Sequence, residues 1–182
     1  AYAVYKYGAR ELPLVISLIT AVGTAALPML STNEQGGLAM LKEKTRRLSH
    51  VLFPVSILLM FLSPFLFKFF YNSSFIDSAL VFNIYMLILI TRLIMPQVII
   101  TARQNNYFLL LCGAIEFTAN VLVSLLLVKS YGLYGIAVGT VVGNLIQKLA
   151  LCLFVRKKYR ISFSDYIPIR TIAFYSLSLL LS

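Results

Sequence analysis

The chain has 182 residues, of which 60% are hydrophobic and only 12% are charged, and its mean hydropathy is +0.89. Soluble domains average about 25% charged residues. The composition therefore excludes a soluble globular domain and predicts an all-α fold, a polytopic bundle of transmembrane helices. The net charge of +10 is attributed to basic loops beside the membrane, and no nucleic-acid partner is expected.

The residues that usually carry chemistry are sparse. Cys112 and Cys152 both fall inside apolar runs, and no histidine lies near them, so neither a disulfide framework, a metal site nor any other cofactor is expected. No nucleophile–base pair or phosphate loop is present. We therefore do not expect an enzyme. A membrane-embedded enzyme of envelope synthesis would need longer loops on the outer side than this chain has.

Apolar runs long enough to cross a core of ~30 Å divide the chain. Five spans and the beginning of a sixth are expected, at about 12–30, 51–70, 79–100, 108–128, 133–155 and 171–182. Short links join most of them, so consecutive helices should be antiparallel neighbours in a single bundle over 1–182. Both ends of the sequence lie in apolar stretches, and we expect the chain to be part of a longer one.

The basic residues predict an orientation. The connections 31–50, 101–107 and 156–170 carry ten of the 16 Lys and Arg residues, and the opposite face carries four. Positive charge gathers on the cytoplasmic side of membrane proteins, so these three connections should be cytoplasmic. The first also contains leucines at helical spacing between charged residues, which predicts a helix lying on the membrane surface.

Three ionisable residues, Arg92, Glu116 and Lys148, lie inside predicted spans. At 1.5 Å per residue each is about 12–14 Å from the cytoplasmic end of its helix, so all three should share one level. In one interpretation Glu116 neutralises a cation and pins helices together. In another, the excess positive charge faces a water-filled cavity and receives an anionic substrate. A third has the long side chains reaching toward the interface.

Other polar and special residues surround these charges. Asn120 lies one turn beyond Glu116 and Asn144 one turn before Lys148, so both could extend a polar cavity lining. Pro64 and Pro96 are candidate bend points, because proline removes a backbone hydrogen bond. Small residues at a spacing of four allow membrane helices to approach closely, and they occur here at Gly135, Gly139 and Gly143.

Two stretches carry a family resemblance. The opening YAVYKYGARELPLVISLITAVGTAALPMLS, which ends in Leu27-Pro28-Met29-Leu30-Ser31, resembles the seventh-to-eighth helix region of bacterial polysaccharide flippases. These are the O-antigen-type transporters of lipid-linked oligosaccharides in the MATE-like superfamily. The later stretch YGLYGIAVGTVVGN resembles the glycine-rich twelfth helix of that family.

The resemblance implies two six-helix lobes, with this chain supplying most of the second and the missing first lobe belonging to the same polypeptide. It implies a multi-pass protein of the bacterial inner (plasma) membrane that flips an undecaprenyl-diphosphate-linked oligosaccharide by alternating access, for surface polysaccharide such as lipopolysaccharide. The expected partners are the lipid bilayer and that substrate, and Arg92 and Lys148 are the candidates for holding its diphosphate. The alternative is a cation-coupled drug or metabolite exporter of the same superfamily.

Overall fold

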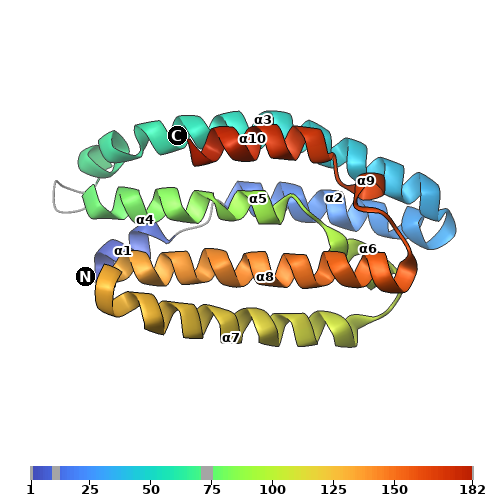
Figure 1. Ribbon diagram of the computed structural model, residues 1–182. Helices are drawn as coiled ribbons and strands as arrows, with labels where there is room; N and C mark the ends of the chain where they lie inside the picture. The colour runs from blue at the N-terminus through green and yellow to red at the C-terminus, as the bar shows by residue number, and fades with distance from the viewer. Residues whose placement is uncertain (1, 10–12, 71–75, 182) are drawn as a thin grey trace.

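Long helices run back and forth along one direction in the computed structural model, which describes residues 2–9, 13–70 and 76–181 (Figure 1). This described part is helical and contains no strand, as the composition predicted. Its helices are α1 (Tyr2–Gly8), α2 (Pro13–Thr32), α3 (Glu34–Phe70), α4 (Ile76–Met86), α5 (Ile88–Arg92), α6 (Pro96–Ala102), α7 (Asn106–Tyr131), α8 (Leu133–Tyr159), α9 (Phe163–Tyr166) and α10 (Ile169–Leu180).

Four of these helices, α2, α3, α7 and α8, are long and apolar enough to cross a membrane, and the bent pair formed by α4–α5 and α6 would make a fifth span. The shorter apolar helix α10 occupies most of the expected sixth span. It packs beside α3, where the Tyr175 ring stacks on Phe53 and its hydroxyl lies 3.0 Å from Nδ1 of His50.

Helix α3 differs from the expectation for residues 31–50. No loop and separate surface helix precede the span, because one continuous helix of 37 residues covers both segments. The turn between α2 and α3 is confined to Asn33, and a Cβ at Gly37 would lie 2.7 Å from the backbone of Leu30. The stripe that was expected to face the membrane surface instead packs inside the protein, with Leu38, Leu41 and Thr45 all buried.

Pro64 lies inside α3 without ending it. Because proline has no N–H, the carbonyl of Met60 four residues earlier loses its usual helical donor. The Ser63 hydroxyl lies 2.9 Å from that carbonyl oxygen, and the Asn83 amide nitrogen of α4 approaches it at 3.5 Å. Neighbouring polar side chains thus supply hydrogen bonds where the helix lacks one, as membrane helices require.

Pro96 occupies a different setting. The expected span at 79–100 is divided into α4, α5 and α6, and the chain bends by 45° between Arg92 and Pro96. Pro96 is the first residue of α6, where its missing N–H costs little. The three linking residues, 93–95, are enclosed by the bundle, which is where irregular backbone at membrane depth is tolerated.

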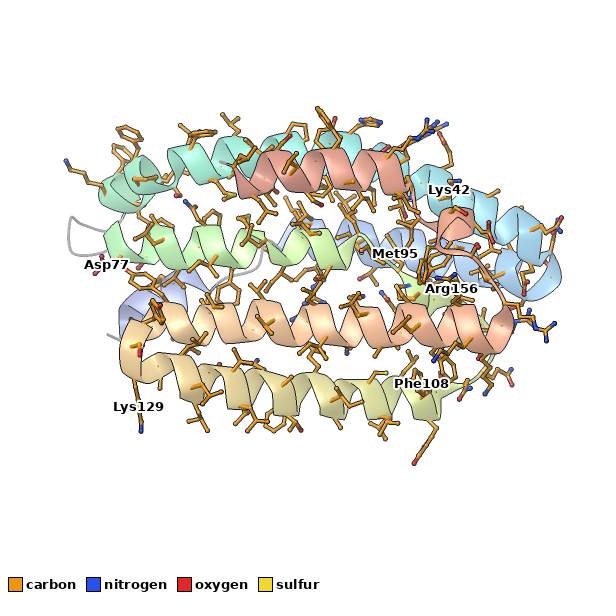
Figure 2. All side chains as sticks on the ribbon, viewed as in Figure 1. Lys42, Asp77, Met95, Phe108, Lys129 and Arg156 are labelled. Atoms are coloured by element: carbon orange, nitrogen blue, oxygen red, sulfur yellow. The ribbon has the colours of Figure 1, made fainter. Side chains whose placement is uncertain are left out.

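The connections α2–α3, α6–α7 and α8–α9 meet at one end of the bundle, and the α7–α8 turn lies at the other (Figure 1). Charged side chains mark both ends, with Lys42 and Arg156 at the first and Asp77 and Lys129 at the second (Figure 2). At the first end Arg103 forms an ion pair with Glu34, and its guanidinium lies 5.6 Å from the centre of the Tyr159 ring. The connections with the most positive charge therefore form one basic end.

Candidate functional site

Lys148 lies at the centre of the candidate site. Its side chain points from α8 into the bundle and is only 6% exposed. Its ammonium Nζ donates a hydrogen bond to Oε1 of Gln97, on the first turn of α6, at 2.8 Å. The partner of this buried cation is thus a neutral amide, which satisfies one of its donors without cancelling its charge.

Gln97 also lines a cavity of about 260 Å³ that lies between α2 and the broken span α5–α6. Among the residues around it that the structure describes, one side chain, Arg92, is charged. The α2 side contributes two threonine hydroxyls at a spacing of four, Thr20 and Thr24, and α6 contributes Thr101. The wall is completed by apolar side chains and one glycine: Ile16, Ile19, Gly23, Leu27, Met95 and Val98.

Arg92 is the last residue of α5, directly before the break, and its side chain is half-buried. It borders a second, much smaller cavity of about 30 Å³, together with Ser56 and Tyr85. The arginine therefore stands where α2, α3 and α4 approach one another. Its position at the end of a broken helix lets a charged side chain reach the cavity from membrane depth.

The common depth of Arg92, Glu116 and Lys148 predicts that they lie near one another, and two of them reach the broken span: Lys148 through Gln97 of α6, and Arg92 as the last residue of α5. Glu116 is half-buried on α7. Glu116 and Lys148, both of which the structure describes, form no direct ion pair, and the ammonium donates to Gln97 instead. Direct neutralisation of Lys148 by Glu116 is therefore not the arrangement in this structure.

The two asparagines do not line this cavity. Asn144 donates from Nδ2 to the carbonyl of Thr140 on its own helix at 3.2 Å. Asn120 accepts a hydrogen bond from the Ser124 hydroxyl at 3.1 Å and borders a separate cavity of about 320 Å³ on α7. Of the five polar residues expected to form one lining, only Arg92 is among the residues around this cavity, and Lys148 reaches it through Gln97.

The glycines of α8 face that interface. A Cβ at Gly135 would lie 2.6 Å from the backbone carbon of Leu127, and one at Gly143 would lie 2.9 Å from the carbonyl oxygen of Glu116. At Gly139 it would collide with the Ser124 side chain. Backbones this close leave no room for any side chain. We call this contact the glycine interface, formed by Gly135, Gly139 and Gly143 against α7.

Gln97 and the threonines were not selected as site residues from the sequence. A signal for the threonines exists, because the α2 residues of the cavity follow one helical face, at positions 16, 19, 20, 23, 24 and 27. Gln97 carries no comparable signal. Its role depends on Lys148, 51 residues further along the chain, and on the bend that turns α6 toward α8.

A bundle of long apolar helices with a broken, cation-bearing span defines a multi-pass membrane protein, and comparison with known families places it among the MATE-like flippases. Within that superfamily, the family model described as lipid II flippase MurJ matches residues 1–181. The chain therefore belongs to the MurJ lipid II flippase family. This corrects the expectation of an O-antigen-type flippase, a different family of the same superfamily. In the same comparisons neither a curated protein nor a solved structure matches.

Proposed function

We propose that this chain is the second-lobe part of a flippase that moves lipid II, a lipid-linked peptidoglycan precursor, from the inner to the outer leaflet of the bacterial plasma membrane. Membership of the MurJ family supports this substrate over an O-antigen oligosaccharide. The first lobe would come from the same polypeptide, and alternating access between the lobes would carry the substrate across. The basic end of the bundle would face the cytoplasm.

The observation that carries the proposal is the cavity beside the broken span. Among the described residues of its lining the charged one is a cation, Arg92, and Gln97 connects the cavity wall to a second, buried cation. Lipid-linked precursors of this class carry their sugar on a diphosphate, whose oxygens accept hydrogen bonds from guanidinium and amide groups. A cationic pocket at membrane depth would stabilise the charged diphosphate when it leaves water.

The outer surface of α7 supports the bilayer as a partner. Apart from Cys112, α7 has no buried residue in the described part of the structure. Large apolar side chains project from it, among them Leu110, Phe117, Leu122 and Leu126. This surface suits lipid chains. The exporter alternative gains less support, because Glu116, a carboxylate inside the spans, does not line the cavity.

The test is translocation by the full chain that contains residues 1–182, reconstituted in lipid vesicles. Fluorescent lipid II is placed in both leaflets, and a membrane-impermeant quencher measures how fast the protected pool becomes accessible. We expect Arg92→Ala to slow translocation at least tenfold, about 1.4 kcal/mol. The control is Arg103→Ala, which removes an arginine of the basic end that does not line the cavity.

Two results would overturn the proposal. The first is a folded wild-type protein that does not translocate lipid II. The second is an Arg92→Ala protein that translocates at the wild-type rate with an unchanged unfolding temperature, because the cavity cation would then have no part in transport.

A further inference from the structure

We infer that Lys148 is a positioning residue: it holds the amide of Gln97 so that its NH₂ group, together with the Arg92 guanidinium, binds one phosphate group of an anionic lipid in the cavity. This inference rests on the proposed function and adds to it a residue, Gln97, and a role for a lysine that does not itself line the cavity. The proposed ligand is defined by what phosphate and diphosphate groups share, which is anionic oxygens that accept hydrogen bonds.

The orientation of the amide follows from its partner. An ammonium has three donors and no acceptor, so only the amide oxygen of Gln97 can face it. The Lys148–Gln97 hydrogen bond, 2.8 Å long, therefore fixes which end of the amide points toward α8. The nitrogen Nε2, with two donors, is left at the other end. In the described part of the chain no hydrogen bond to that nitrogen is found, and the side chain lines the cavity.

The burial of Lys148 explains why the lysine needs an intermediary. At 6% exposure its ammonium lies behind the cavity wall, and it is absent from the lining residues. A positive charge behind an amide oxygen polarises the amide and strengthens its N–H groups as donors, because hydrogen bonds in a chain reinforce one another in a low dielectric. The buried charge of Lys148 thus strengthens the hydrogen-bond donors that Gln97 presents at the cavity surface.

The charges around the site favour an anion. Arg92 lines the same cavity as Gln97, Lys148 lies behind Gln97, and the carboxylate of Glu116 is not hydrogen-bonded to Lys148. A phosphate between the Arg92 guanidinium and the Gln97 amide would accept hydrogen bonds from both and bring a negative charge toward the two cations. A neutral headgroup would gain the hydrogen bonds without the charge interaction. The site should therefore distinguish lipids by the charge of the headgroup and not by the apolar chain.

The decisive variant is Gln97→Glu in the full chain. A glutamate has the same length and can still accept from Lys148, so the packing and the buried hydrogen bond are kept. It offers no donor to the cavity and brings a negative charge toward the anion. We expect at least tenfold weaker binding of undecaprenyl diphosphate in detergent micelles, unchanged binding of uncharged undecaprenol, and an unfolding temperature equal to or above that of the wild type.

Gln147→Glu is the matched control, since it makes the same substitution next to Lys148 at a half-buried position that does not line the cavity. It should bind both probes like the wild type. A second pair of variants tests the lysine. Lys148→Met should lose diphosphate binding, and Lys148→Arg, which still donates to Oε1, should restore it. The ratio of the two affinities is the readout, because a loss of folding would lower both.

The inference is overturned if Gln97→Glu binds the diphosphate probe like the wild type, or if Gln97→Glu and Gln147→Glu weaken it equally. Should Gln97→Glu fold poorly, the Lys148 pair decides: equal binding ratios for Met and Arg would overturn the inference. Failure of the proposed function looks different. In that case the wild type binds the diphosphate probe and Gln97→Glu does not, yet vesicles show no translocation of lipid II.

Discussion

The two sides of α8 show how one membrane helix combines two kinds of contact. On the side toward α7, three glycines let two backbones meet with no side chain between them. Roughly half a turn around the helix, Lys148 reaches a partner on α6 instead. The first side places α8 in the bundle and carries no charge. The second carries a charge that packing alone does not explain. Substitutions on the two sides should therefore fail in different ways.

Gly139→Leu should have the largest effect. A side chain there meets Ser124, whose backbone nitrogen would lie 2.9 Å from the new Cβ, and the α7 backbone cannot withdraw without opening the glycine interface. We expect a loss of about 3 kcal/mol in the free energy of unfolding, or failure to accumulate in the membrane. Denaturant unfolding in detergent micelles measures it. A leucine tolerated at full stability would show that the two helices are not in close contact.

Gln97→Met tests whether the other side also holds the structure together. Methionine keeps the approximate length but offers the buried ammonium no acceptor oxygen. Leaving a buried charged donor without a partner should cost about 2 kcal/mol in the free energy of unfolding. Gln97→Glu, measured in parallel, should cost nothing. If both variants unfold alike, the hydrogen bond between Lys148 and Gln97 contributes nothing to stability.

Tyr85→Phe probes a polar contact of α8 away from the 260 Å³ cavity. The Tyr85 hydroxyl lies 2.6 Å from that of Tyr5 and 3.3 Å from that of Thr140, so it links α1, α4 and α8. Its removal should lower stability by about 1 kcal/mol. Binding of undecaprenyl diphosphate, measured on the same sample, should not change. A change in binding would extend the functional surface beyond the cavity.

Gly113→Ala should have the smallest effect, and of opposite sign. Gly113 lies on α7, but a Cβ there would meet no atom within 4 Å, so it lies outside the glycine interface. Alanine in a helix loses less conformational entropy on folding than glycine does, which predicts a gain of about 0.5 kcal/mol. Thermal unfolding beside Gly139→Leu gives the comparison. A loss here would mean that α7 has a contact on its apparently open side.

Periodicity and residue type predicted one side of α8 better than the other. Glycines four apart lie on one helical face whatever surrounds them, so the sequence alone pointed to close packing at these positions. The depth argument places Arg92, Glu116 and Lys148 at one level, which stays a prediction. Depth does not determine which polar side chain meets which. The pairing of Lys148 with Gln97 depends on a 45° bend that single residues do not specify.

A helix on the membrane surface was expected within residues 31–50, but its continuity with the following span was not predicted, for a related reason. Gly36 and Gly37 together favour a loop by intrinsic propensity. In the structure Gly37 serves close packing against Leu30 instead, so tertiary contact overrides that preference.

Pro64 and Pro96 are both prolines in apolar runs, and only their structural surroundings distinguish them. Asn83 and Ser63 stand beside the Met60 carbonyl, and α3 continues through Pro64.

The length of α3 connects its membrane span with the basic end of the bundle. Its 37 residues extend about 55 Å, well beyond a hydrocarbon core of ~30 Å, so one continuous helix reaches from the membrane to the basic end. Glu34 lies in the first turn of this helix, at the basic end. Glu34 is paired with Arg103, the residue that follows α6. One ion pair thus connects the first turn of α3, at the basic end, with the end of the short helix that carries Gln97.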